Sequence, residues 1–545
     1  MATITINGVQ VEFEGKPTIL QVAQDNGLAI PHYCYHRALS IVGSCRLCLG
    51  EVAQPNPRQG NQLEWIPKLV PTCQTTAVDG MVVNTKSPKS IANQKAVMEF
   101  LLINHPLDCP VCDQAGECEL QDYSYQYGRA ESRMRDDKIK QPKKDLGQHV
   151  YLYADRCIMC TRCVRFTREI TGTSELAVIG RGNREQIDLF PGRALDNELS
   201  GNVVDICPVG AMLDKDFLFS QRVWFLSKTP SIDGLTASGD NITLEHNSAR
   251  IYRLKPRLNM AVNRWWTSDE IRYGWKFIHD EKRLTTPMRQ QPGGQIPCAW
   301  ARAYEEVVTG FRSLVTEHGP GSLAVMVSPM LACEEAYLLA KFILSLDPQA
   351  TLAVGPVPVK GADKSFPGGY TIRAEKCPNS RGVRRALELA AAGAQSIMDY
   401  AAFTQALADK QSKTKGLLLT GGYPEDWVQK DLTSAVGSRF TVLIDILPRS
   451  IAGKVNLLLP GATWAEKAGS FENAGARIQG FEKAVNPPGE AKPEGQIALD
   501  LLAQADATPP QRYDPATIRT EMALTVAEPP KRPAARLPAM HYVEL

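Results

Sequence analysis

Twelve residues in the first part of the chain have the types and the spacing of metal ligands. They form three sets of four: Cys34, Cys45, Cys48 and Cys73; His105, Cys109, Cys112 and Cys118; and Cys157, Cys160, Cys163 and Cys207. All but three of the chain's 14 cysteines belong to these sets. Thiolates bind iron–sulfur clusters and zinc, and three complete sets along one chain suggest a path for electrons.

The first set places three cysteines on one loop, and we expect the fourth, Cys73, on a separate strand. This spacing is similar to that of plant-type 2Fe-2S ferredoxins. Gly43 and Ser44 are small enough for backbone N–H groups to approach the sulfurs of a buried anionic cluster. Cys45-x-x-Cys48 alone would also allow zinc, but the ten-residue gap before that pair is unusual for a zinc ribbon.

The second set contains a histidine, His105, four positions before the pair Cys109-Pro-Val-Cys112. It completes a set that would otherwise have three ligands. An imidazole in place of a thiolate makes a cluster less negative by one charge, which raises its reduction potential. From these residues alone, a 4Fe-4S cluster and a zinc site with three cysteines and one histidine both remain open.

The third set, Cys157-x-x-Cys160-x-x-Cys163 with the distant Cys207-Pro208, is typical of a 4Fe-4S cluster. No further cysteine follows near Thr167, so we expect a two-cluster ferredoxin fold that holds one cluster. Four arginines crowd the motif: Arg156, Arg162, Arg165 and Arg168. They form either a solvated face or a set of charges that offsets a buried negative cluster.

The composition is that of a soluble globular protein with several domains. The chain has 545 residues, of which 43% are hydrophobic and 22% are charged, and its net charge of +2 gives no reason to propose nucleic acid as a partner. No apolar run is long enough to span a bilayer. The first residues resemble neither a signal nor a transit peptide, so we expect a cytosolic protein, in which clustered cysteines are metal ligands rather than disulfides.

Periodicity predicts a multidomain protein of α+β and α/β type. Short alternating segments with a helix over 18–26 indicate a β-grasp domain, 88–127 is helical, and 150–225 is a compact cysteine-bearing unit. From about residue 276, strands alternate with helices as in a parallel sheet. The predicted domains are 1–82 (2Fe-2S), 83–127 (4Fe-4S with one histidine and three cysteines), 145–222 (ferredoxin-like 4Fe-4S), 223–279 (small domain), 280–508 (α/β) and 509–545 (extended Pro-rich tail).

Residues 1–225 closely resemble the large iron–sulfur subunit family of respiratory complex I (the bacterial G subunit and the mitochondrial 75 kDa subunit). The matching motifs are Pro31-x-x-Cys34-Tyr35, Gly43-x-Cys45-Arg46-x-Cys48, Cys109-Pro-x-Cys112-Asp113, Gly116-x-Cys118-x-Leu120-Gln121 and Arg156-Cys157-x-x-Cys160-x-Arg162-Cys163-x-x-Phe166. The resemblance implies one 2Fe-2S cluster on the first set and one 4Fe-4S cluster on each of the other two, with His105 as a ligand. The resemblance also argues against zinc as the metal that these sets bind.

A weaker resemblance, to molybdopterin oxidoreductases, extends to about residue 505. Some members hold a further 4Fe-4S cluster, and the aligned positions here are Asp233, Thr236, Asp240 and Ser268, none of which is a thiol. We therefore expect that cluster and a molybdopterin to be absent, and the α/β domain to be a degenerate scaffold. The isolated Cys298, Cys333 and Cys377 are expected to be small buried hydrophobes.

The resemblances imply an electron-transfer subunit of proton-translocating NADH:quinone oxidoreductase, without catalytic acid–base residues. The chain has no Gly-x-Gly-x-x-Gly fingerprint and no Walker A motif, so NADH and flavin (FMN) are expected on a partner subunit. Electrons would pass from the first set to the third, then to the second, and leave through a cluster-bearing peripheral-arm subunit towards quinone. Such a protein is expected at the cytoplasmic side of the bacterial inner membrane, held there only through its complex.

Two alternatives remain from the sequence. One is the iron–sulfur subunit of a soluble NAD-linked hydrogenase or formate dehydrogenase, although the further active-site cysteines that those enzymes need have no convincing counterpart here. The other is a structural protein stapled by zinc.

Overall fold

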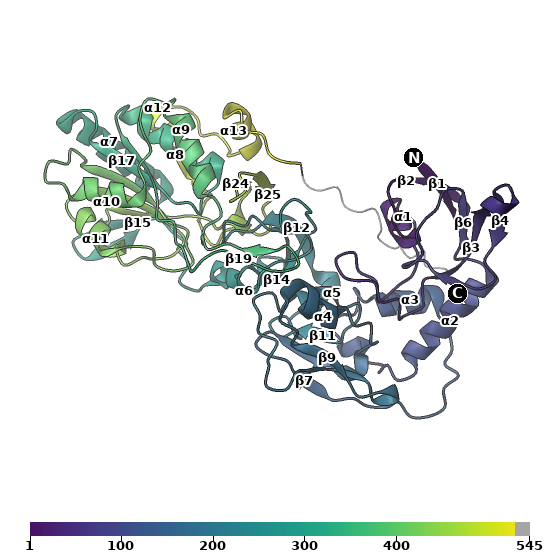
Figure 1. Cartoon of the computed structure of the whole chain (residues 1–545). Coiled ribbons are helices and arrows are strands. Elements are labelled where there is room, and N and C mark those ends of the chain that lie inside the picture. The colour runs from purple at the N-terminus through teal and green to yellow at the C-terminus, as the bar shows by residue number, and fades with distance from the viewer. Residues whose placement is uncertain (529–545) are drawn as a thin grey trace. The chain divides into compact units, whose positions relative to one another are not determined.

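The computed structural model describes residues 1–528, and its contacts divide the chain into two units. Among the described residues, the first contains Met1–Leu226 together with Phe366–Gly369, and the second contains Ser227–Ser365 and residues 370–528 (Figure 1). The boundary after Leu226 lies close to the predicted one after residue 222. The finer divisions of the chain stay predictions.

The first unit begins with a mixed sheet in the order β2-β1-β6-β3-β4, with β5 also paired to β3. Its elements are β1 (Ala2–Ile6), β2 (Val9–Phe13), α1 (Ile19–Asp25), β3 (Leu49–Asn56), β4 (Gln62–Trp65), β5 (Val70–Pro71) and β6 (Met81–Asn84). β1 pairs antiparallel with β2 and parallel with β6, and α1 covers the sheet through Ile19, Leu20 and Val22. Thr18 caps α1 reciprocally with Gln21, which explains why the helix begins there. This is the predicted β-grasp arrangement.

Two helices follow, as the apolar periodicity predicted. α2 (Pro88–Leu102) starts at the N-cap Ser87, and α3 (Glu119–Tyr127) packs against it. Tyr33 of the β-grasp domain lies beside Tyr123 of α3, with ring centroids 5.2 Å apart. The segment that carries the second ligand set therefore runs between the ends of two packed helices.

The rest of the first unit is made of short elements around the third ligand set. They are β7 (Lys143–Asp145), β8 (Val150–Tyr153), α4 (Arg162–Arg165), β9 (Leu176–Ile179), β10 (Gln186–Leu189), α5 (Asn202–Ile206) and β11 (Met212–Asp214). β8 pairs antiparallel with both β7 and β11, and β9 pairs antiparallel with β10. Because β11 lies beside β8, the end of α5 returns next to the loop that follows β8.

The second unit opens with a three-stranded antiparallel sheet, β12 (Ser227–Ile232), β13 (Asn241–Asn247) and β14 (Arg250–Pro256), followed by α6 (Asp269–Tyr273). Its main sheet has the order β16-β15-β23-β22-β21-β17-β18. The strands are β15 (Met288–Gln291), β16 (Gly294–Pro297), β17 (Leu323–Val327), β18 (Thr351–Val354), β21 (Gly416–Thr420), β22 (Phe440–Asp445) and β23 (Leu457–Pro460). The five strands from β23 to β18 are parallel, as predicted.

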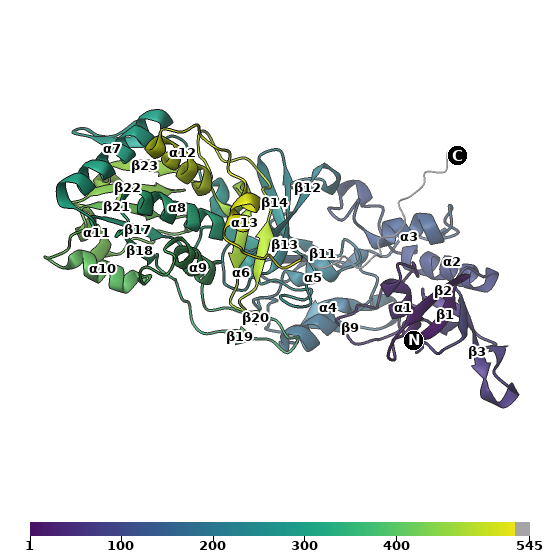
Figure 2. The same ribbon diagram turned by 90° about the horizontal axis from the view of Figure 1, so that it is seen from above.

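Helices cover both faces of this sheet (Figure 2). One face packs on α7 (Trp300–His318), α8 (Cys333–Leu346), α9 (Ser380–Ala390) and α12 (Glu494–Asp506), and the other on α10 (Tyr400–Ala408) and α11 (Lys430–Val436). Successive residues of β17 alternate between these two cores, since side chains along a strand point to opposite faces. Two hairpins complete the unit: β19 (Lys364–Ser365) with β20 (Thr371–Ile372), and β24 (Gly469–Glu472) with β25 (Ile478–Phe481).

One prediction about the C-terminal part is wrong. Residues 509–545 were expected to be extended, but Pro515–Glu521 form a helix, α13. Asp514 caps it with bonds to the amides of Ala516 and Thr517, and Ile518 buries itself against the α8 side of the sheet. The prolines suggested an extended chain, yet Pro515 stands at the first helical position, where its missing N–H costs nothing. The rest of that prediction, from residue 529 onward, lies outside the described residues.

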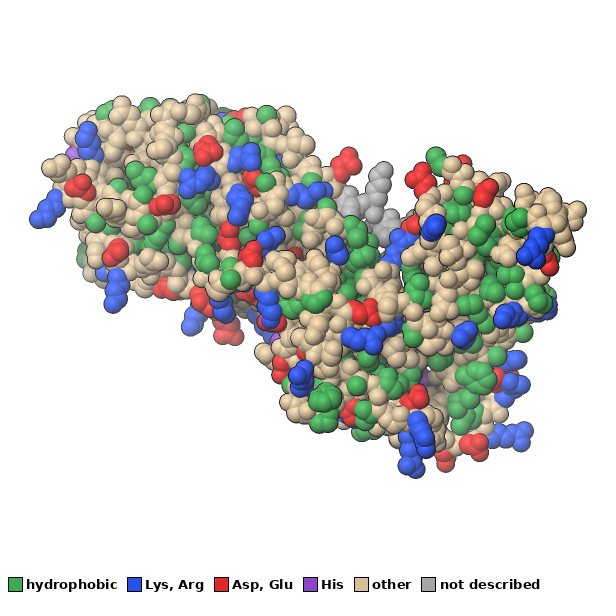
Figure 3. Space-filling model, viewed as in Figure 1, with side chains coloured by type: hydrophobic (Ala, Val, Ile, Leu, Met, Phe, Trp, Pro, Cys, Tyr) green, Lys and Arg blue, Asp and Glu red, His purple; other side chains and the backbone are tan. Residues whose placement is uncertain are grey.

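The surface agrees with the near-neutral charge of the sequence. Lys and Arg side chains are interspersed with Asp and Glu on the face shown in Figure 3. Among residues 1–528, no helix is long and apolar enough to cross a membrane.

Candidate metal centres

The structure brings the four cysteines of the first set together. Cys34, Cys45 and Cys48 lie on the loop between α1 and β3, and Cys34, Cys48 and Cys73 are buried. A hydrogen bond from the Cys45 thiol lowers the pKa of Cys34 to about 5, and one from the Cys73 thiol lowers the pKa of Cys48 to about 7. The sulfurs thus form two adjacent pairs, each of which holds one thiolate readily.

Cys73 departs from the prediction that it belongs to a strand. It lies in a turn two residues after the end of β5. Thr72 holds this turn against the ligand loop, because its hydroxyl donates to the carbonyl of Cys48 over 2.9 Å. Gly43 has a φ of +61°, in the left-handed region that favours glycine, and an added Cβ would lie 2.5 Å from the side chain of Gln74. The approach of its backbone N–H to the sulfurs stays a prediction.

The second set lies between α2 and α3. His105, Cys109 and Cys118 line one groove of about 910 Å³, and Cys118 is the N-cap of α3. Burial, followed by the positive charge of Arg156, lowers the pKa of His105 to about 4. The imidazole is therefore neutral at physiological pH, which is the form that binds a metal.

Cys112 faces away from that groove, towards the turn after Cys207. A Cβ added to Gly210 would lie 2.2 Å from the sulfur of Cys112. Cys118 also lies near this turn, with its sulfur 4.0 Å from the carbonyl oxygen of Pro208. The second and third ligand sets therefore meet at the segment 207–210.

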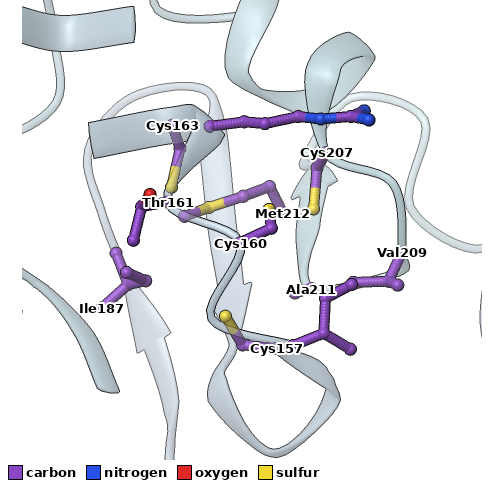
Figure 4. A pocket seen from close by; sticks show the side chains of 11 residues that line it. Cys157, Cys160, Thr161, Cys163, Ile187, Cys207, Val209, Ala211 and Met212 are labelled. Carbon is purple, nitrogen blue, oxygen red and sulfur yellow. The ribbon is translucent and has the colours of Figure 1, made fainter. Parts of the chain in front are cut away.

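The third set lines an enclosed space, into which the sulfurs of Cys157, Cys160, Cys163 and Cys207 project (Figure 4). Ile187, Val209, Ala211 and Met212 form apolar walls around them. Burial raises the pKa of Cys157 to about 12 and that of Cys160 to about 11, and it raises the pKa of Cys163 well above its usual range. These thiols need the charge of a bound metal to ionise, so metal binding must release protons.

The loop of the third set is held in an unusual backbone conformation. Met159 and Thr161 have φ values of 53° and 59°, in the left-handed region that non-glycine residues rarely adopt. These residues flank the predicted ligand Cys160, and the amide of Met159 donates to the sulfur of Cys157 over 3.4 Å. Such strain is typical of sites whose surroundings fix the geometry.

The donor chemistry fits iron–sulfur clusters: eleven thiols and one neutral imidazole. Within residues 1–528, no three His, Cys, Asp or Glu side chains converge closely enough to hold one metal ion. The four thiols of the third set line one small cavity.

Three of the four arginines near the third set are buried, so they are not a solvated face. Arg156 donates to the carboxylate of Asp108 over 2.8 and 3.0 Å, and Arg162 lies 3.6 Å from Glu119. Only Arg168 is exposed. Sequence spacing gave no sign of Asp108 or Glu119, although both neighbour predicted ligands. Asp108 contacts Arg156, which is 48 positions away in the sequence, and Glu119 contacts Arg162, which is 43 positions away.

The four positions aligned with the further cluster do come together in the second unit. Asp233 accepts hydrogen bonds from the hydroxyls of Thr236 and Ser238, over 2.5 and 3.1 Å. Tyr370 donates to Asp240 over 2.6 Å, and its hydroxyl accepts from the amide of Ser268 over 3.0 Å. Burial raises the pKa of Asp233 to about 7 and that of Asp240 to about 6. These four positions carry hydrogen-bonded oxygens and no thiol.

The three remaining cysteines are only partly as expected. Cys333 and Cys377 are buried, with sulfurs 3.5 Å from the side-chain oxygen of Asn379 and 3.6 Å from that of Glu375, respectively. Cys298 is half-buried rather than fully buried, because it lies between the edge hairpin β15–β16 and the start of α7.

Five family models match the chain. They are a 2Fe-2S iron–sulfur cluster binding domain (residues 1–88), the NADH-ubiquinone oxidoreductase-G iron–sulfur binding region (94–133), the ferredoxin-like domain of NADH-quinone oxidoreductase subunit 3 (147–213), a NADH-ubiquinone oxidoreductase NDSU1/NuoG-like 4Fe-4S domain (226–276) and molybdopterin oxidoreductase (386–504). The domain classes are those predicted. Residues 226–276 contain no cysteine, although the model that they match is described as a 4Fe-4S domain.

Curated relatives carry matching names. The chain is 42% identical over 57% of its length to the mitochondrial NADH-ubiquinone oxidoreductase 78 kDa subunit of Neurospora crassa, and 35% identical over 64% to the G subunit of NADH-quinone oxidoreductase from Rickettsia felis. It is 38% identical over 58% to the NADH-ubiquinone oxidoreductase 75 kDa subunit of Reclinomonas americana. The chain spans less than half the length of these relatives, covering 40%, 49% and 44% of them, respectively.

Among solved structures, the chain is similar to an NAD+-reducing [NiFe]-hydrogenase in the H2-reduced state. The match covers 41% of this chain and 91% of the hydrogenase chain, with 28% sequence identity and a TM-score of 0.35.

Proposed function

We propose that this chain, a homologue of the G subunit of NADH-quinone oxidoreductase, is the electron-transfer iron–sulfur subunit of such an enzyme. In this proposal, Cys34, Cys45, Cys48 and Cys73 hold a 2Fe-2S cluster, and the sets that begin with His105 and Cys157 each hold a 4Fe-4S cluster. The observation that carries the proposal is the third site, where four thiols from two separate segments line one enclosed space. When bound, these clusters supply one-electron oxidation and reduction.

The protein's own residues bind the clusters and set the surroundings. The thiols and the neutral imidazole of His105 are the ligands, and burial of most of them excludes water. Arg156, Arg162 and Arg165 are buried beside the ligand loops. Their positive charges offset the negative charge that thiolates bring into the interior. The chain therefore tunes the reduction potentials through ligand charge, burial and hydrogen bonding.

The partners belong to the same proposal. The chain has no dinucleotide fingerprint, so NADH and FMN bind a partner subunit, and a cluster-bearing peripheral-arm subunit takes the electrons towards quinone. Exposed apolar side chains beside Cys109, such as Leu107 and Val111, suit a face that a partner covers. No molybdopterin is expected in the second unit, and the chain meets the cytoplasmic side of the inner membrane only through the complex.

Metal analysis and electron paramagnetic resonance of the full chain, purified without oxygen, test the proposal. Two four-iron clusters and one two-iron cluster give about ten irons per chain. Reduction should yield signals of one 2Fe-2S and two 4Fe-4S centres. A preparation that holds only zinc, or one with a third four-iron cluster, would contradict the assignment.

A further inference from the structure

One guanidinium joins two ligand loops that are far apart in the sequence. Arg165, on α4, donates through one amino group to the carbonyl oxygen of Cys34 over 2.5 Å and to that of Cys160 over 3.1 Å. Its other amino group donates to the carbonyl oxygen of Ser40 over 2.5 Å. Cys34 belongs to the first ligand set and Cys160 to the third, so a single side chain spans both sites.

The residue is well placed to hold this geometry. Arg165 is only 3% exposed, and hydrogen bonds from a buried charged group are stronger than neutral ones. Arginine also suits the role better than lysine, since its planar fork presents several donors in fixed directions. A shorter or neutral side chain at this position would leave the buried carbonyl groups of Cys34 and Cys160, and the partly buried one of Ser40, without this donor.

Glu169, one turn further along, strengthens the same contact. Its two carboxylate oxygens accept from the amide and the hydroxyl of Ser40 over 2.8 and 2.6 Å. The segment 34–40 is therefore held at both ends by the region that follows the third ligand loop. By contrast, Arg162 points the other way, with its NH1 group 3.2 Å from the carbonyl of Ile206 and its NH2 group 3.6 Å from Glu119 beside Cys118.

We infer that Arg165 is a positioning residue that fixes the first cluster loop against the third, and so sets the separation of two consecutive electron carriers. This inference rests on the proposed function for the carriers themselves. The hydrogen bonds of Arg165 do not depend on that proposal, because they join backbone carbonyls that are present with or without clusters. Arg165 touches the backbone of two ligands and is not a ligand.

Amide hydrogen exchange and electron paramagnetic resonance on the full chain test the inference. The variants are R165Q and R165K, and R184Q is the control. Arg184 is an exposed arginine of the same ferredoxin-like region. The amides of Leu39 and Ser40, which donate to the carbonyl of His36 and to Glu169, should exchange at least about tenfold faster in both Arg165 variants. R184Q should exchange like the unchanged protein.

The second measurement distinguishes positioning from simple support. In the cluster-loaded chain, the spin relaxation of the 2Fe-2S signal by the reduced third-set cluster depends steeply on their separation. It should weaken or spread in R165Q and R165K, while iron content stays the same. R165K retains the positive charge, so a change shared by both variants comes from the lost fork and not from the lost charge.

Three results would overturn the inference. Unchanged exchange at Leu39 and Ser40 in both variants would show that the bridge does not hold the loop. Faster exchange with unchanged spin relaxation would make Arg165 a local support without a positioning role. A chain that binds no clusters would remove the proposed function and the positioning role together, while the exchange data would still report on the bridge.

Discussion

At the scale of single residues, His105 is the proposed ligand whose identity has the clearest electrical consequence. Its imidazole is half-buried and its pKa is lowered to about 4, so it adds no charge to the site at neutral pH. A thiolate in its place adds one negative charge beside the same cluster. The difference between the two ligands is therefore a difference in reduction potential rather than in cluster type.

The variant His105→Cys should keep about the same iron content and lower the reduction potential of one 4Fe-4S centre, because an extra negative charge favours the oxidised cluster. A redox titration followed by electron paramagnetic resonance measures the shift. His318→Cys provides the control, since His318 lies in the last turn of α7, in the second unit. Unchanged potentials in H105C would rule out His105 as a ligand.

Residue types and their spacing predicted the three ligand sets. They could not predict which side chains from distant parts of the sequence contact these sets. Cys34 and Arg165 are 131 positions apart, and Arg156 and Asp108 are 48 apart. Spacing within a loop is visible in the sequence because neighbouring ligands share one short segment. A partner from another segment becomes visible only when the fold brings it near, so the roles of Glu119, Asp108 and Arg165 had no local signal.

At the scale of elements, the turn between α5 and β11 joins two sites. Cys207 ends this helix and serves the third set, while Gly210, three residues later, lies against Cys112 of the second set. The pairing of β11 with β8 holds the turn in place, because β8 leads directly into the loop with Cys157. The sequence predicted a compact cysteine-bearing unit here, but the close approach at Gly210 depends on tertiary packing.

Gly210→Ala tests that close approach. The new Cβ would meet the sulfur of Cys112 at 2.2 Å and the Cβ of Gln114 at 3.0 Å, so the second set must shift. The variant should lose up to about four irons and the signal of the 4Fe-4S cluster with the histidine ligand, while the 2Fe-2S signal persists. Iron analysis and resonance spectra measure this loss.

Gly437→Ala is the matched control, because Gly437 has a negative φ and no heavy atom within 4 Å of its added Cβ. It should retain all the iron. If G210A also kept a full complement of iron and unchanged spectra, the contact between Cys112 and the 207–210 turn would not constrain the second site.

At the scale of the whole molecule, the two units have different sources of stability. The second unit has large apolar cores on both faces of its parallel sheet. The first unit has a smaller core in its β-grasp domain, which includes the proposed ligands Cys48 and Cys73, and short elements around the other sites. Clusters that bind only the folded form add stability to the unit that holds them.

Removal of iron by oxidation and chelation should therefore weaken the first unit selectively. We expect amide exchange to rise around residues 34–48, 105–118 and 157–163, where buried thiols would be left without a metal. Burial raises the pKa values of Cys118, Cys157 and Cys160, so these three would be left as buried neutral thiols. Exchange in β17, β21 and β22 should stay slow, since these strands are buried on both faces by apolar side chains. An equal rise in amide exchange in both units after iron removal would contradict this prediction. It would mean that the clusters stabilise the whole chain as one cooperative folding unit.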